Sequence, residues 1–182
     1  MTDEVPRAAP ASAAPAGPLR APLAPDATAA LDWLFDHGFL GGHATAAVIG
    51  LVVDGESLLL VGAVGDLPPL PRHDPPALPL SADLPLCRAA ALGECTGMAT
   101  AAEIRSRSPW LAVFAPAARA AITVPIRAGG RLIGAIGVTY SVELPGTGDL
   151  SARLREIADS LGASLRVPAD RLSAEVRSPV PS

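Results

Sequence analysis

Apolar residues recur at helical spacing in two stretches of the chain, residues 26–38 and residues 150–165. After Asp26, a favoured N-cap residue, alanine, leucine and phenylalanine repeat at this spacing up to Gly38, which suits the left-handed end of a helix. From Leu150 to Leu165 leucine and isoleucine recur about every 3.5 residues, as in a helix that packs on another helix. The pattern predicts two terminal helices.

Nearly continuous apolar runs predict two β-hairpins between these helices. AAVIGLVVD and SLLLVGAVG flank the turn residues 54–56, where Asp-Gly is a favoured hairpin turn. In residues 121–127, large apolar side chains alternate with smaller or polar ones, as in a strand. The turn 128–130 follows, and LIGAIGVTY is the partner strand. Because Pro125 cannot donate to a ladder, we expect a bulge or a free edge there.

The segment between the hairpins is predicted to hold a loop and two short helices. Prolines fill residues 66–80, and so many X-Pro bonds favour a surface loop over a helix or a strand. Asp83 can cap a helix over residues 84–92, which Gly93 ends. The sequence TAAE at residues 100–103 is a capping box and starts the second short helix.

The ends of the chain have a different composition from its middle. Residues 1–25 are rich in proline and alanine and poor in core-forming side chains, so we expect them to be disordered. Residues 167–182 are polar and proline-punctuated, and we expect a flexible tail. One folded domain is predicted over residues 26–166.

Composition excludes several classes of function. A net charge of -4 and a pI near 5.3 argue against binding to nucleic acid or to anionic membranes. No apolar run approaches the roughly 20 residues that cross a bilayer, and the N-terminus lacks the features of a signal peptide, so a cytoplasmic location is expected. The chain has no lysine, which excludes a P-loop lysine and a Schiff base.

The order of these elements resembles that of a GAF domain, the small α/β sensor module of signalling proteins. The resemblance is strongest in EIRSRSPWLAVFAPAARAAITVPIRAGGRLIGAIGVTYS, which is similar to GAF modules of bacterial regulatory proteins. It implies an α+β fold: an antiparallel sheet with terminal helices on one face and short helices and loops on the other. We expect a stand-alone module without an output domain.

The ligand motifs of known GAF subclasses are absent. Cyclic-nucleotide GAF domains carry an Asn-Lys pair, and this chain has neither residue. Bilin-binding GAF domains carry Cys followed by His, whereas Cys87 precedes Arg88 and Cys95 precedes Thr96. GAF enzymes that reduce free methionine sulfoxide use three cysteines in their own loop motifs, which the two cysteines here do not match.

The resemblance nevertheless indicates where a ligand would lie. The larger side chains on the pocket-lining segments would form the walls, and one of two arginines would anchor an anion. The alternative is that the large side chains only fill the core. The candidate ligand-binding residues are Met98, Arg107, Trp110, Phe114, Arg119 and Tyr140.

Neither the cysteines nor the histidines form a recognisable site. Eight residues of continuous helix would part the Cα atoms of Cys87 and Cys95 by roughly 12 Å, too far for a disulfide unless the helix breaks at Gly93. We expect both thiols to be buried and structural. His37 and His43 lack a third ligand at a metal-binding spacing, so no metal site is predicted.

These observations predict a sensory or regulatory domain that binds a small molecule and has no catalytic activity of its own. We expect a homodimer formed through the terminal helices, and a separate signalling output protein as partner. The cofactor is unknown. Two alternatives remain: an interaction scaffold with a closed pocket, and a thiol-dependent redox sensor or enzyme that uses Cys87 and Cys95.

Overall fold

The computed structural model describes residues 26–67 and 75–165, so the predicted disordered segment 1–25 and tail 167–182 lie outside the described residues. No helix in the described part is both long and apolar enough to span a membrane. The helices are α1 (Ala27–Asp36), α2 (Pro85–Leu92), α3 (Ala101–Arg107), α4 (Pro109–Phe114) and α5 (Gly148–Ser164). The strands are β1 (Ala44–Val53), β2 (Ser57–Gly65), β3 (Ala77–Pro79), β4 (Thr96–Met98), β5 (Ala120–Ala128) and β6 (Arg131–Tyr140).

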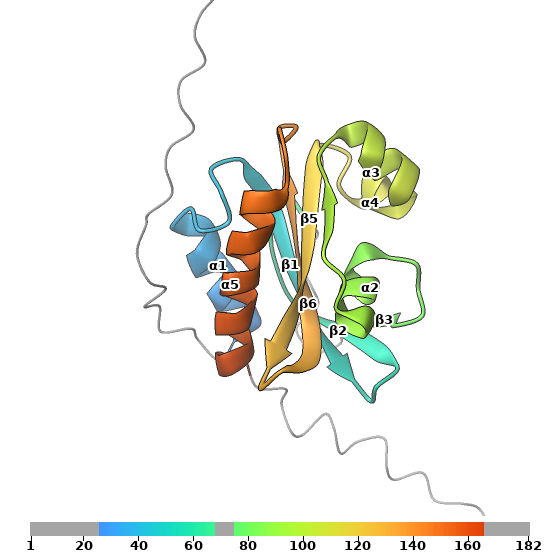
Figure 1. Cartoon of the computed structure of the whole chain (residues 1–182), viewed down its shortest axis with the longest axis vertical. Coiled ribbons are helices and arrows are strands. Elements are labelled where there is room, and N and C mark those ends of the chain that lie inside the picture. Colours follow the sequence, from blue (N-terminus) through green and yellow to red (C-terminus); the bar gives the residue numbers. More distant parts are fainter. Residues whose placement is uncertain (1–25, 68–74, 166–182) are drawn as a thin grey trace, which may run out of the picture.

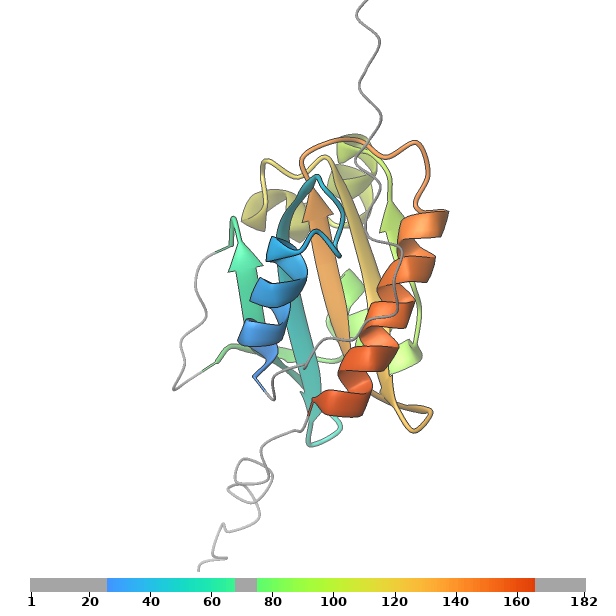
Figure 2. The ribbon, with the colours of Figure 1, turned by 90° about the vertical axis from the view of Figure 1, so that its left-hand side faces the viewer.

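The six strands form one antiparallel sheet in the order β3-β2-β1-β6-β5-β4. Figure 1 shows α1 and α5 on one face of this sheet and α2, α3 and α4 on the other. In Figure 2 the two terminal helices lie side by side in front of the sheet. This arrangement confirms the predicted α+β fold with terminal helices on one face and short helices on the other.

The main hydrophobic core lies between the sheet and the terminal helices. Helix α1 packs on β1 and β2, and α5 packs mainly on β5. The α5 stripe of Leu154, Ile157 and Leu161 is at most 2% exposed, because it covers the sheet of its own chain. The stripe is therefore not a free seam between helices. The homodimer stays a prediction, and its interface would have to use the outer surface of the terminal helices.

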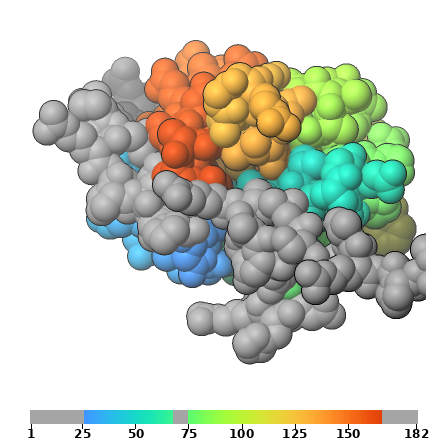
Figure 3. Space-filling view, turned by 90° about the horizontal axis from the view of Figure 1, so that it is seen from below, coloured from blue at the N-terminus to red at the C-terminus, as the bar shows by residue number. Residues whose placement is uncertain are grey.

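A close backbone contact sets the distance between α5 and the sheet. A Cβ atom added at Gly162 would overlap the carbonyl oxygen of Arg127, near the end of β5. Figure 3 views this end of the molecule, where the β5–β6 turn lies beside the end of α5. Only glycine lets the helix approach the strand this closely.

The local signals for helix ends are largely confirmed. Asp26 caps α1 by accepting a hydrogen bond from the Thr28 amide (2.9 Å), and Gly93 ends α2 in a left-handed conformation. At the predicted capping box, Thr100 Oγ1 accepts from the Glu103 amide at 3.2 Å. The Glu103 carboxylate reaches back one residue further than expected and accepts from the Ala99 amide at 2.7 Å.

Three local predictions are wrong. The predicted loop 66–80 contains β3, whose Pro79 is tolerated because β3 is an edge strand that pairs only with β2. Asp83 does not cap α2, because its exposed carboxylate lies 3.6 Å from Arg88 and Leu84 occupies the N-cap position. The second short helix is broken at Ser108 into α3 and α4, since a proline follows.

We predict that Gly162→Ala lowers the free energy of unfolding by about 1–3 kcal/mol, because α5 must move away from β5 to admit the methyl group. Gly148→Ala is the matched control. A Cβ at Gly148, the first residue of the same helix, meets no atom within 4 Å. The free energy of unfolding of the Gly148→Ala variant should stay unchanged or rise slightly. Chemical denaturation measures both, and equal stabilities would show that α5 does not rest on this contact.

We predict that Thr100→Ala destabilises the domain by about 1 kcal/mol through loss of the N-cap of α3. Ser106→Ala, which removes an exposed hydroxyl from the same helix, should change stability by less than about 0.5 kcal/mol. Thermal melting distinguishes the two variants. If both melt at the wild-type temperature, the Thr100 hydroxyl does not cap the helix.

Candidate functional site

The two faces of the sheet carry side chains of different size. On β5 and β6, large residues such as Ile122, Ile136 and Tyr140 are fully buried in the core beneath α1 and α5. Because side chains alternate along a strand, the residues between them point to the face covered by α2 and the other short helices. On that face the sheet residues are mostly small: Ala46, Ala63, Ala121, Thr123, Gly137 and Thr139.

A cavity of about 420 Å³ lies on this small-residue face. Its floor comes from β1, β2, β5 and β6, and its walls come from residues 84–86 at the start of α2 and from α4. At Gly137 on this floor, an added Cβ would lie 3.4 Å from Leu86 Cδ1 and 3.6 Å from Thr123 Oγ1. These are ordinary contact distances, so the cavity is bounded here by packed side chains.

The helix α4 forms an open wall of the cavity. It packs mainly on α3, and none of its residues is buried. Trp110 and Phe114 line the cavity although each is 62% exposed, and their ring centroids lie 6.4 Å apart. A molecule in the cavity can therefore contact two aromatic rings that otherwise face solvent.

The polar groups of the cavity are neutral hydroxyls. Ser108 is 2% exposed, and its Oγ has no hydrogen-bond partner among the described residues. Thr139 Oγ1 pairs with Thr45 Oγ1 at 3.0 Å, and Thr123 lies beside Gly137 on the floor. Among the described residues no ionisable side chain lines the cavity. A charged molecule would lose its hydration there without a counter-charge, so the site suits an uncharged, mainly apolar molecule.

Of the six candidate ligand-binding residues, the structure brings Trp110 and Phe114 together at this cavity. Tyr140 lies on the other face of the sheet, because it continues the alternation of large residues along β6. Its hydroxyl is buried without a hydrogen-bond partner among the described residues, and burial raises the pKa of the phenol. Met98 is buried in a separate cluster with Ile104 and Ala118.

The prediction of an arginine that anchors an anion is wrong for this cavity. Arg107 is exposed at the end of α3, and its Nη1 donates to the Gly97 carbonyl oxygen at 3.1 Å. Arg119 is exposed just before β5, where its backbone amide donates to the Tyr140 carbonyl oxygen. Neither side chain lines the cavity.

The two cysteines are free and lie in different surroundings. Cys87 is fully buried in α2, as predicted, and burial raises the pKa of its thiol. Cys95 is exposed, so the prediction of a buried thiol is wrong there; α2 ends at Leu92 and the chain leaves the core. The Cys95 Sγ accepts a hydrogen bond from Arg155 Nε of α5 at 3.0 Å.

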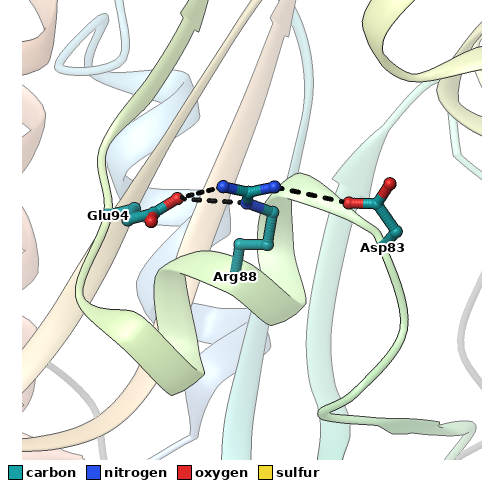
Figure 4. Close-up of polar contacts among 3 residues, drawn as sticks. All are labelled: Asp83, Arg88 and Glu94. Carbon is teal, nitrogen blue, oxygen red and sulfur yellow. Dashed lines mark hydrogen bonds and ion pairs between the residues drawn. The ribbon is translucent and has the colours of Figure 1, made fainter.

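A second, shallower concavity lies beside α2 and contains the pair Asp83 and Arg88. Figure 4 shows Arg88 between two carboxylates, with Nη2 2.8 Å from Glu94 Oε2 and Nη1 3.6 Å from Asp83 Oδ1. The guanidinium is thus already paired on both sides. Its contacts join α2 to the segments before and after it, and they leave no free cation for an anionic ligand.

Sequence reasoning missed the polar and small residues of the cavity, namely Ser108, Thr123, Gly137 and Thr139. The signal that could have found them is the alternation in β5 and β6, where isoleucine and valine alternate with alanine, glycine and threonine. When a strand carries only small residues on one face, either another element packs very closely on that face or a cavity is left there.

Comparison with known proteins supports the fold. No protein-family model and no curated protein matches the sequence. Among solved structures, a type II free methionine-R-sulfoxide reductase from Thermoplasma acidophilum matches with a TM-score of 0.58 and 20% identity, over 77% of this chain and 92% of that one. A free methionine-R-sulfoxide reductase from Neisseria meningitidis, in complex with its substrate, matches with a TM-score of 0.55 and 19% identity, over 75% of this chain and 72% of that one. The A. aeolicus nlh2 GAF domain in an inactive state matches with a TM-score of 0.54 and 16% identity, over 74% of this chain and 79% of that one. The chain has a GAF-like fold.

These similarities correct the prediction that the chain is not an enzyme. That prediction is wrong because the GAF-like fold is shared by enzymes, the free methionine-R-sulfoxide reductases, as well as by other GAF domains, one of them from a GAF sensor protein of Burkholderia vietnamiensis. The missing catalytic motifs in the sequence therefore do not identify a non-enzyme.

Proposed function

We propose that this protein is a small-molecule-binding GAF-fold domain with a sensory or regulatory role, and that its ligand is uncharged. The observation that supports this most directly is the cavity of about 420 Å³ between the small-residue face of the sheet and α2 and α4. This volume lies in the range of about 300–1,000 Å³ typical of small-molecule sites. A few hydroxyl groups in a mainly apolar lining are also typical of such sites.

The cavity supports ligand binding over a scaffold with a closed pocket. In a closed pocket, the side chains of the short helices would fill the space above the small residues of the floor. Here α4 instead keeps Trp110 and Phe114 largely exposed at the edge of the cavity. Exposed aromatic side chains gain contact area when a ligand enters, which favours a binding site.

We predict that the neutral dye N-phenyl-1-naphthylamine binds the wild-type protein with saturation at one molecule per chain. Ala63→Leu, which adds side-chain volume at the floor on β2, should weaken binding by about tenfold, or 1.4 kcal/mol. Ala102→Leu makes the same change at an exposed position of α3 outside the cavity lining and is the matched control. Fluorescence titration measures all three affinities. Equal binding by both variants would place the dye outside the cavity.

A second candidate function is thiol-dependent redox chemistry at Cys95. It is supported by the exposed thiol and by the hydrogen bond from the Arg155 guanidinium to its sulfur. This hydrogen bond holds the exposed sulfur beside α5, where a reagent from solvent can approach it. The fold similarity to free methionine-R-sulfoxide reductases also supports this candidate. In such a reaction the Cys95 sulfur would take the sulfoxide oxygen, which leaves the sulfide and a sulfenic acid. An external dithiol would then reduce the sulfenic acid back to the thiol, release water and become a disulfide.

This candidate predicts that iodoacetamide alkylates Cys95 faster in the wild type than in Arg155→Met. Arg153→Met is the control, because Arg153 lies on the same helix over the Phe39 ring and does not contact the thiol. Mass spectrometry follows alkylation at each cysteine. With dithiothreitol as the reductant, free methionine-R-sulfoxide should yield methionine with wild-type protein and not with Cys95→Ser. A Cys95→Ser variant as active as wild type would exclude this candidate.

A further inference from the structure

We propose that Ser108 anchors the ligand by donating a hydrogen bond, and that the ligand is an uncharged aromatic molecule with a carbonyl-type acceptor. This inference rests on the proposed binding function and specifies the class of molecule. It depends on the position of Ser108, on its unpaired hydroxyl and on the surfaces that surround it.

Ser108 occupies a position where a serine side chain ordinarily has another use. It is the N-cap residue of α4, and its carbonyl oxygen accepts from the Leu111 amide at 3.0 Å. A serine at this position normally accepts a hydrogen bond through its side chain from the second or third amide of the helix. The Ser108 hydroxyl makes no such bond. Its backbone φ of −148° and ψ of 69° orient the residue differently from the extended N-cap Thr100.

The unused hydroxyl belongs to a buried residue of the cavity wall, and a rotation about its Cα–Cβ bond is the movement that would turn it toward a bound molecule. Ser108 is 2% exposed and lines the cavity, and its Oγ has no partner among the described residues. A buried polar group without a hydrogen bond is unfavourable and uncommon in folded proteins. The neighbouring hydroxyl of Thr139 is already paired with Thr45. Among the hydroxyls of the described lining, Ser108 Oγ is the fully buried one without a partner, and Thr123 on the floor is a second hydroxyl within the cavity.

The chemistry of the ligand follows from what Ser108 and its neighbours lack. A buried donor without a partner is less tolerable than an acceptor with a spare lone pair, so the ligand should supply an acceptor. Because no ionisable side chain lines the described cavity, that acceptor should belong to a neutral group such as a ketone, ester or amide. The exposed rings of Trp110 and Phe114 favour an aromatic body beside it.

The experiment uses 6-propionyl-2-dimethylaminonaphthalene, a neutral dye with one ketone, and 2-dimethylaminonaphthalene, which lacks the ketone. The chain has two tryptophans, and Trp33 lies on α1 on the other face of the sheet. In a Trp33→Phe background, Trp110 becomes the sole tryptophan, and its quenching reports occupancy of the cavity. The dye's emission shifts to longer wavelength when its ketone accepts a hydrogen bond.

We expect the ketone dye to bind the Trp33→Phe protein with red-shifted emission. Adding Ser108→Ala should weaken this binding about three- to tenfold and shift the emission to shorter wavelength. The dye without the ketone should bind both proteins equally. Ser106→Ala, which removes an exposed hydroxyl from α3, should behave as the parent protein.

The alternative outcomes separate this inference from the proposed function. If both dyes bind and Ser108→Ala changes neither affinity nor emission, the anchoring role is wrong and the binding function stands. The same holds if Ser108→Ala lowers the melting temperature as a lost helix cap would, with binding unchanged. If the anionic dye 8-anilinonaphthalene-1-sulfonate quenches Trp110 as well as the neutral dye does, the preference for uncharged ligands is wrong. If no dye quenches Trp110, both the inference and the binding function fail.

Discussion

The structure depends on one constraint: the central strands carry large side chains on one face of the sheet and small ones on the other. Strand alternation places Ile122 and Ile136 beneath the terminal helices and Thr123 and Gly137 beneath the short ones. The large-residue face is filled by α1 and α5 and becomes the main core. The small-residue face leaves more space than the short helices fill, so the cavity follows directly from the size of the side chains on its floor.

The same strands connect the cavity to the helix on the opposite face. β5 contributes Thr123 to the cavity floor, and near its end the Arg127 carbonyl oxygen is in close contact with Gly162 of α5. A close-packed core transmits small displacements, because it has little free space in which to absorb them. A molecule that pushes on the floor of the cavity therefore acts on strands whose other face supports α5. This gives a physical route from a bound ligand to the outer surface of the terminal helices.

Sequence reasoning succeeded where the signal was local. The N-cap at Asp26, the turn at Gly55 and the Thr100 cap each depend on residues within one turn of the chain, and each is confirmed. The Glu103 half of the capping box differs, because its carboxylate accepts from the Ala99 amide. It failed where the outcome depends on tertiary packing. The packing of helices against the sheet decides on which face Tyr140 lies, and it also decides that Cys95 is exposed. The ligand site stays a prediction: Trp110 and Phe114 line the cavity, whereas the side chains of Arg107 and Arg119 do not.

Sensors and reductases share this fold, and in this chain the features that suit each are spatially separate. The cavity has neutral lining groups and no thiol among its described residues, while Cys95 is exposed beside Arg155 of α5. A free amino acid carries an ammonium and a carboxylate, and each would need a charged or strongly polar partner in a buried site. The described lining residues offer neither, so methionine sulfoxide is a poor fit for this part of the cavity. Thiol chemistry at Cys95 would therefore use a surface outside the cavity, and a substitution in the cavity floor should leave it unchanged. The two proposed functions would therefore use separate parts of one scaffold, so that a test of either proposal leaves the other to be tested at its own residues.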